Sequence, residues 1–175
     1  LTYAPAYNLG RGFYLEGASK ESQTLIAWMA RNRLNLCSFR PNTGPHGNKL
    51  AMENFVGGHI FEALLEPDLR QPDGRTLWEA HPEWYGTPAN SPKAKATALN
   101  TQFCVAREDL LDYLFGHFLR WLQRDWAEAD RVDFWPFDTW GRACCCPDCE
   151  RLGNDTDKQI HLLAAFRKRL DEALG

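Results

Sequence analysis

Two short apolar segments, residues 12–15 and 34–40, flank a segment in which apolar residues recur at helical spacing. That spacing predicts a helix over residues 19–33, with Ser19 at its N-cap. The flanking segments are bounded by Gly or Pro, which is typical of short strands. Only a few residues connect the three elements. A strand, a helix and a strand joined this closely indicate two parallel strands with the helix crossing between them.

The second half of the chain continues this alternation. Residues 108–126 carry an apolar stripe at helical spacing, and residues 131–138 predict a third strand. A last helix is predicted to begin at Asn154 or Asp155. One of its faces is expected to consist of Ile160, Leu163, Phe166 or Arg167, Leu170 and Leu174.

Residues 41–103 interrupt the alternation. They hold seven of the ten prolines and many Gly and Asn residues, with short helical segments predicted only near 61–65 and 82–85. We therefore expect a long loop insertion at about 41–103. A loop of this length inside a compact domain is usually functional.

The order of elements predicts the fold class α/β, with parallel βα units in a single domain over residues 1–175. Three parallel strands do not close a sheet, and a (β/α)₈ barrel typically takes about 250 residues. A small open α/β sheet and an incomplete TIM-type (β/α)₈ barrel are both compatible with the pattern, and we favour the barrel. An incomplete barrel leaves a strand edge and apolar helix faces uncovered, which would favour self-association.

Charge and hydropathy exclude two classes of partner. Lys and Arg number 20 and Asp and Glu number 23, which gives a formal net charge of −3. A chain so nearly balanced is not expected to present the broad basic face that nucleic acid requires. Since no apolar run approaches the roughly 18 residues of a membrane helix, we expect no membrane partner either.

Four of the six cysteines are crowded into residues 144–149. The spacing Cys144-x-Cys146-x-x-Cys149 places three thiols in one tight turn, where thiolates can converge on a cation at about 2.3 Å. Cys104 is the best candidate for a fourth ligand, because the start of the helix at 108 and the loop after the strand at 131–138 belong at the same edge of a parallel sheet. We expect Cys145 to point away. These residues predict a structural zinc site.

Two alternatives to zinc remain at this stage. Cys104 could form a disulfide with one cysteine of the cluster, or all the thiols could be free. Four thiolate ligands would leave no open position for water, so such a metal would hold loops together and would not act as a catalytic cofactor.

Asp138 ends the strand predicted at 131–138, where barrel enzymes place polar site residues. Trp135 and Trp140 flank it. A carboxylate beside exposed aromatic rings suits carbohydrate, because hydroxyl groups bond to the carboxylate while the C–H face of the sugar stacks on an indole. The alternatives are that Asp138 caps a loop and that Trp135 packs in the core.

Two histidines lie in the predicted long loop, His59 after Gly57-Gly58 and His81 before Pro82-Glu83-Trp84-Tyr85. A neutral imidazole can donate a hydrogen bond to a sugar hydroxyl. Ordinary surface histidines are the alternative for both. Glu16 and Arg40, at the ends of the first two predicted strands, share the position at the sheet edge but have weaker support.

Several of these segments together resemble a known family. They are residues 28–35 (Trp-Met-Ala-Arg-Asn-Arg-Leu-Asn), residues 57–61, residues 81–85, Cys104, and Asp138 followed by the cysteine cluster. In this order they resemble a bacterial glycosidase-like barrel family of unknown function that is related to α-glucuronidases and family 20 hexosaminidases. That family usually has an acidic residue where this chain has Cys145. The four cysteines are also similar to the structural zinc site of family 42 β-galactosidases.

The resemblance implies a (β/α)₈ barrel that acts on, or binds, complex carbohydrate. We expect the chain to be a segment of a glycoside hydrolase that works by acid/base hydrolysis, with the main catalytic carboxylates beyond residue 175 and with no activity in this segment alone. The residues expected to contact the sugar are His59, Asp138, Trp140 and His81. A non-catalytic carbohydrate-binding module and a zinc-stabilised interaction module are the alternatives. The resemblance assigns no compartment, although glycan-degrading relatives are often exported to the periplasm or the medium.

Overall fold

The computed structural model describes residues 12–13, 20–38, 47, 49–86, 103–135 and 143–175. The chain, for which a single domain over 1–175 was expected, divides into two compact units. Unit 1 comprises Leu1–Gly58 and Arg124–Asp133, and unit 2 comprises His59–Gln123 and Phe134–Gly175.

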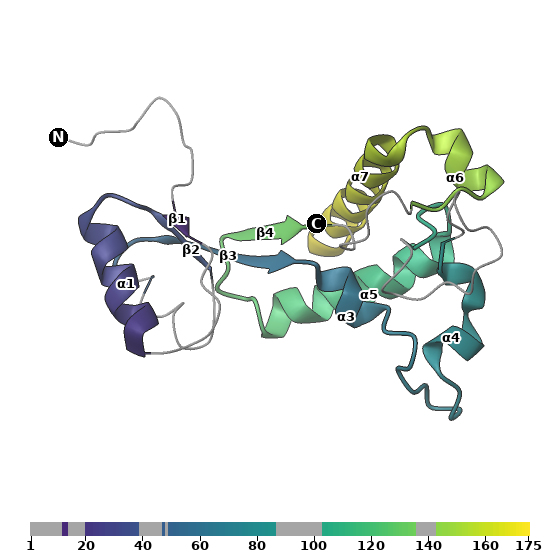
Figure 1. Cartoon of the computed structure of the whole chain (residues 1–175), viewed down its shortest axis with the longest axis horizontal. Coiled ribbons are helices and arrows are strands. Elements are labelled where there is room, and N and C mark those ends of the chain that lie inside the picture. The colour runs from purple at the N-terminus through teal and green to yellow at the C-terminus, as the bar shows by residue number, and fades with distance from the viewer. Residues whose placement is uncertain (1–11, 14–19, 39–46, 48, 87–102, 136–142) are drawn as a thin grey trace. The chain divides into compact units, whose positions relative to one another are not determined.

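A four-stranded sheet contains β1 (Gly12–Phe13), β2 (Leu36–Ser38), β3 (Glu53–Gly58) and β4 (Arg131–Phe134), in that order across the sheet. β1 pairs with β2 and β2 with β3, both in parallel. The arrow of β4 points the same way as that of its neighbour β3 (Figure 1). The strands thus follow one another across the sheet without a reversal of order.

β3 corrects the sequence analysis, which predicted three strands and a loop over 41–103. The strand buries Asn54, Phe55 and Val56. Its partner β4 is held at its start, because the backbone N–H of Asn54 donates to the Asp130 carboxylate at 2.8 Å and the Asp130 N–H donates to the Asn54 carbonyl at 2.9 Å. The strand was missed because Gly57 and Gly58 occupy its end and favour a turn in the sequence pattern.

Helix α1 (Lys20–Arg31) covers a small core in unit 1. Ile26 and Met29 of this helix are fully buried against Met52. Trp28, which the periodicity places on the same apolar stripe, is instead 46% exposed. The buried face is therefore narrower than the apolar spacing predicts.

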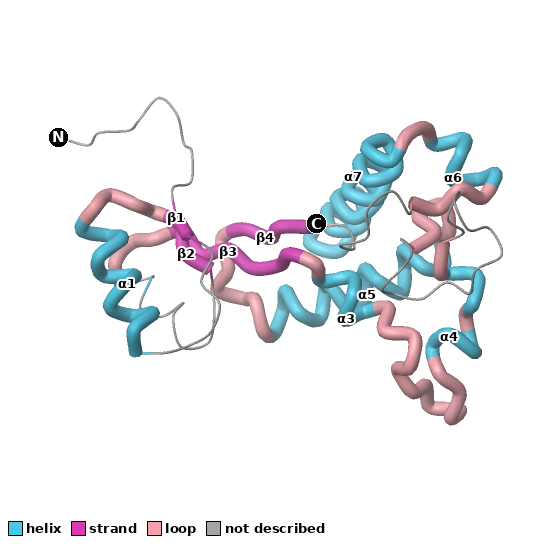
Figure 2. Tube along the Cα trace, viewed as in Figure 1, coloured by secondary structure: helices cyan, strands magenta, loops and turns pink. Residues whose placement is uncertain are grey.

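Unit 2 is built mainly from helices (Figure 2). They are α3 (Ile60–Leu64), α4 (Leu77–Ala80), the 3₁₀ turn η1 (Pro82–Trp84), α5 (Glu108–Arg124), α6 (Pro147–Leu152) and α7 (Asp155–Leu174). At their centre is Phe61, whose ring lies 5.0 Å from that of Phe103 and 5.9 Å from those of Phe134 and Phe166. This aromatic cluster forms the core of the unit.

The buried face predicted from the sequence is confirmed for the long helix α5 but only in part for α7. α5 buries the predicted stripe from Leu110 to Phe118. α7 begins as predicted after Asn154, whose side chain accepts hydrogen bonds from the first turn. It buries Phe166, which belongs to the predicted face, but it also buries Leu162 and leaves the predicted face residue Ile160 58% exposed.

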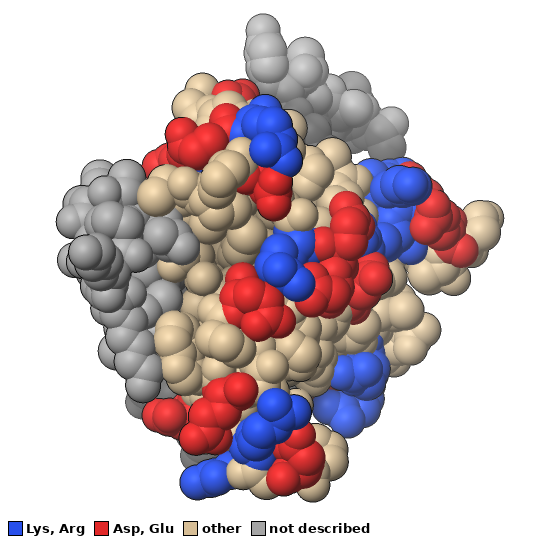
Figure 3. Space-filling view, turned by 90° about the vertical axis from the view of Figure 1, so that its right-hand side faces the viewer, with Lys and Arg blue, Asp and Glu red and all other residues tan. Residues whose placement is uncertain are grey.

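Charged side chains of both signs alternate on one face of the molecule (Figure 3). Several charged side chains of the described residues form ion pairs, among them Arg169 on α7, which is 15% exposed. Its guanidinium donates to Glu108 at 2.6 Å and to Asp112 at 2.8 Å, both on α5. Arg169 therefore fastens the two long helices together. Among the described residues, no helix is both long and apolar enough to cross a membrane.

Gly57, near the end of β3, allows the backbone to approach β4 closely. Its φ is +104°, and a Cβ at this position would overlap the backbone carbonyl of Asp133. Only glycine meets both conditions, because any side chain would be strained by the positive φ and would also push the two strands apart. Gly74 has a similar φ of +86° but open space around it.

We predict that Gly57→Ala lowers the free energy of unfolding by about 2–4 kcal/mol, since it adds a steric clash to the backbone strain. Gly74→Ala is the matched control and should cost about 1 kcal/mol, the strain alone. Urea unfolding measures both. Equal losses for the two variants would contradict the proposed close approach of the strands.

The first turn of α5 is tied to η1 by a charged hydrogen bond. The indole Nε1 of Trp84 donates to Asp109 at 2.9 Å, and Arg107 binds the same carboxylate through two nitrogens at 3.1 Å. The hydrogen bond from Arg107, assisted by that from Trp84, lowers the pKa of Asp109 to about 2.

Because the pKa of Asp109 is depressed in the folded state, its contribution to stability is present above about pH 4 and is lost as the pH falls towards 2. The side chain is 48% exposed, so solvent screening should keep the contribution below about 1 kcal/mol. We predict that Asp109→Asn is less stable than the wild type at pH 7 and shows a smaller loss of stability between pH 4 and pH 2. Chemical unfolding at a series of pH values measures this, and parallel acid profiles for the two proteins would contradict it.

Candidate functional site

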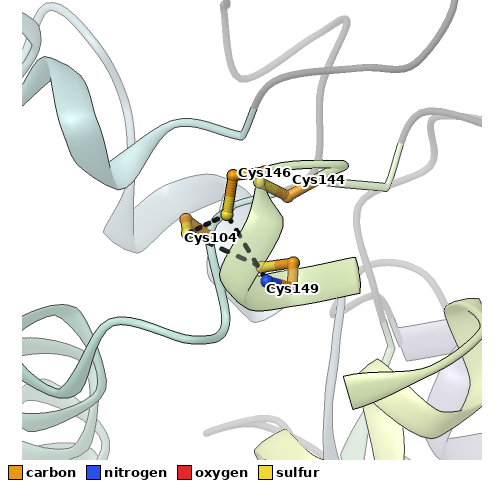
Figure 4. Close-up of side chains that lie close together, drawn as sticks. All are labelled: Cys104, Cys144, Cys146 and Cys149. Carbon is orange, nitrogen blue, oxygen red and sulfur yellow. Dashed lines mark hydrogen bonds between the residues drawn. The ribbon is translucent and has the colours of Figure 1, made fainter. Parts of the chain in front are cut away.

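Four cysteine side chains of unit 2 converge on one point (Figure 4). The sulfurs of Cys104, Cys144, Cys146 and Cys149 all lie within 4.8 Å of one another. Cys104 Sγ is 3.6 Å from both Cys146 Sγ and Cys149 Sγ. The structure thus brings together all four residues that the sequence analysis grouped, across some forty positions of the chain.

The cluster residues 144–149 owe their arrangement to the start of α6. Cys146 is the N-cap residue of this helix, and its sulfur accepts a hydrogen bond from the backbone N–H of Cys149 at 3.5 Å. Pro147 follows at the first helical position, where its missing N–H costs nothing. The turn therefore points Cys146 and Cys149 towards the same space.

Cys104 reaches this space from the other side. Its backbone N–H donates to the carbonyl of Trp84 at 2.9 Å, next to an isolated antiparallel bridge between Tyr85 and Phe103. Three residues later, the N–H of Arg107 donates to the Cys104 carbonyl at 3.2 Å and begins the turn into α5. The ligand candidate is thus fixed by its backbone on both sides.

The thiols are deeply buried and crowded. Cys104, Cys144 and Cys149 expose 6%, 3% and 0% of their surface. Hydrogen bonds from Cys144 and Cys149, together with burial, raise the pKa of Cys104. For Cys149 the hydrogen bond with Cys104 acts to lower the pKa, but Cys144 and burial outweigh it and raise the value to about 12. Four negative charges here would need a cation to balance them.

The geometry fits a tetrahedral metal ion. Sulfurs at about 2.3 Å from zinc in a tetrahedron lie about 3.8 Å apart, close to the 3.6 Å separations seen here. The same separations are well above the bond length of about 2.05 Å in a disulfide, and Cys104 and all the cysteines at 144–149 carry free thiols. Cys145, as expected, lies outside the group of four.

His59 lies directly after β3 and at the N-terminus of α3, and its ring makes a T-shaped contact with that of Trp135. The ring centroids are 5.1 Å apart and the planes are inclined by 77°. Trp135 follows β4 directly and is 41% exposed. The interpretation of Trp135 as a core residue is therefore wrong. No signal in the sequence distinguishes an exposed aromatic residue at this position from a packed one.

His81 lies in a different setting. Its ring stacks flat on the indole of Trp84, with centroids 3.8 Å apart and planes inclined by 6°, and its Nδ1 is 3.3 Å from Glu83. Trp84, which the sequence analysis did not single out, is only 4% exposed and accepts the backbone hydrogen bond of Cys104. The structure therefore places His81 against Trp84, the residue whose backbone is hydrogen-bonded to Cys104.

The remaining candidates for sugar binding, Asp138 and Trp140, lie outside the described residues, as do Glu16 and Arg40. Their roles stay as predicted from the sequence.

Comparison with known proteins gives one distant match. No family model matches the chain, and no curated protein matches its sequence. Among solved structures, an alpha-galactosidase from Lactobacillus brevis is similar, with a TM-score of 0.43 and 16% sequence identity. The match covers 86% of this chain but 23% of that protein. The family resemblance based on the motifs therefore stays a prediction.

Proposed function

We propose that Cys104, Cys144, Cys146 and Cys149 bind one structural zinc ion. The observation that carries this proposal is the convergence within 4.8 Å of four free thiols, three of which are buried. Soft thiolate ligands in a tetrahedral arrangement select zinc over hard cations, and four of them leave no position for substrate or water. The ion would join the segment before α5 to α6.

We predict that the chain binds one zinc ion and that Cys104→Ser abolishes or greatly weakens this binding. Cys145→Ser is the matched control, because Cys145 is the neighbouring thiol that lies outside the group. Native mass spectrometry and competition with a chromophoric chelator measure stoichiometry and affinity. Equal affinity of the wild type and Cys104→Ser would exclude the proposed ligand set.

Removal of the metal should also destabilise unit 2, because an ion bound only by the folded state stabilises it by mass action. At free zinc about 1,000-fold above the dissociation constant, the stabilisation is about 4 kcal/mol. Thermal unfolding with zinc and with excess chelator measures the difference. An unchanged melting temperature would contradict a structural role.

For the chain as a whole, we propose a βα segment of a carbohydrate-active (β/α)₈ protein. The strand order β1-β2-β3-β4 supports this, because consecutive strands lie side by side in a barrel, whereas an open doubly wound sheet reverses its order at a switch point. Residues that follow the strands would then belong to the face that holds the active site. The sequence that follows the segment in the parent gene tests this, and further βα units with acidic residues at strand ends are expected.

His59 and Trp135 are our candidates for saccharide contacts at that face. Both directly follow strands, and the indole of Trp135 is 41% exposed while it makes a T-shaped contact with the imidazole of His59. An indole held in this way can stack on the C–H face of a sugar ring. Asp138 and Trp140 follow within five residues of Trp135 and would complete such a site.

We predict that Trp135→Ala lowers the affinity for a bound oligosaccharide about tenfold, the value of one good stacking contact. Trp28→Ala, which removes a similarly exposed indole from α1, should leave the affinity unchanged. A glycan array identifies the probe and calorimetry measures its affinity. If both variants bind like the wild type, Trp135 does not contact saccharide.

A further inference from the structure

Trp84 is attached to the segment around Cys104 at two separate points. Its carbonyl oxygen accepts the hydrogen bond from the Cys104 N–H at 2.9 Å. Its indole Nε1 donates to Asp109, also at 2.9 Å, and Asp109 lies five residues after Cys104. The backbone and the side chain of Trp84 therefore bind the two ends of residues 104–109, and we call this pair of hydrogen bonds the Trp84 bracket.

That stretch is short and has internal hydrogen bonds of its own. The N–H of Arg107 donates to the Cys104 carbonyl, and its guanidinium binds the Asp109 carboxylate that receives the indole proton. Trp84 thus binds both ends of the turn that leads from Cys104 into α5, through its carbonyl at Cys104 and through its indole at Asp109. A displacement of the indole would break the tie at Asp109 and free the turn to move.

The indole of Trp84 is itself in contact with two aromatic rings. The ring of His81 stacks on it at 3.8 Å, and the ring of Tyr113 from α5 lies 4.8 Å away. Its exposed fraction is 4%. Aromatic contacts of this kind fix the orientation of an indole, so that its Nε1 points to one acceptor. The acceptor is Asp109, at the start of α5.

We infer that Trp84 is a positioning residue for the metal centre, with His81 as its support, and that the pair sets the affinity for metal through Cys104. The inference rests on the zinc site proposed above. Three of the four sulfurs come from residues 144–149, whereas Cys104 alone comes from a distant part of the chain. Because a tetrahedral site needs the fourth thiolate in place, the free energy of metal binding includes any cost of ordering Cys104. Because the Trp84 bracket orders Cys104 when the chain folds, this cost is no longer part of the free energy of metal binding. It also gives His81 a role at the metal centre in place of the predicted contact with sugar.

The test compares four variants of the whole chain, loaded with Co²⁺ as a spectroscopic substitute for zinc. Trp84→Phe removes the indole donor and keeps an aromatic ring for the stack with His81. Asp109→Ala removes the acceptor from a side chain that is 48% exposed, so it folds even if Trp84→Phe does not. Asp109→Asn keeps an acceptor oxygen and serves as the conservative rescue. Tyr85→Phe is the matched control, because it deletes a neighbouring buried hydrogen bond, from Tyr85 to the Leu65 carbonyl at 2.9 Å, without touching the bracket.

We expect Trp84→Phe and Asp109→Ala to weaken metal binding about 10- to 100-fold, as the loss of an outer-shell partner typically does. Their Co²⁺ absorption bands should shift, since the sulfur geometry changes. Asp109→Asn should recover most of the affinity, and Tyr85→Phe should lose stability while keeping both the affinity and the spectrum of the wild type. Wild-type affinity in Asp109→Ala, or an equal loss in Tyr85→Phe, would overturn the inference while leaving the zinc site intact. A wild-type chain that binds no Co²⁺ or Zn²⁺ would instead refute the zinc site itself.

Discussion

The approach of Cys104 to the cysteines at 144–149 is the constraint on which the arrangement of unit 2 depends. Cys104 leads into α5, and α6, which carries Cys149, leads into α7. The same two long helices meet again through the ring of Phe166 against those of Phe115 and Phe118. The sulfur contacts thus join the segments that precede α5 and α7, and the aromatic contacts join the two helices themselves. A cation bound by the four sulfurs would hold the segments before the two helices together, while the aromatic core holds the helices together.

The sheet has a different kind of constraint, the close approach of two backbones. The Cα of Gly57 faces the backbone carbonyl of Asp133 so closely that there is no room for a Cβ, and both residues belong to unit 1. The spacing of β3 and β4 in unit 1 is therefore governed by a residue that carries no side chain. The sheet at this point depends on backbone geometry and not on the packing of side chains.

Much of this could be predicted from the sequence, and the failures have physical reasons. The cysteine group was predictable because three thiols within six residues can face one cation only in a tight turn, and because the expected parallel βα order suggested Cys104 as their partner. β3 was missed because glycines needed for a close approach look like a turn. Trp84 was missed because its role depends on hydrogen bonds to Cys104 and Asp109, which lie 20 and 25 positions away and leave no periodic signal. Trp135 was misjudged because an aromatic residue after a strand has the same sequence pattern whether it packs inward or faces solvent.

The spacing of the four cysteines has a consequence for biosynthesis. A ribosome makes Cys104 and the whole of α5 before it adds the cysteines at 144–149, so during that interval Cys104 lacks the other three thiols of the proposed site. The Trp84 segment, already synthesised, can hold that thiol in place during the interval. The start of α5 would then be ordered while the other three sulfurs are still to come, and metal capture would be the last step of assembling this region.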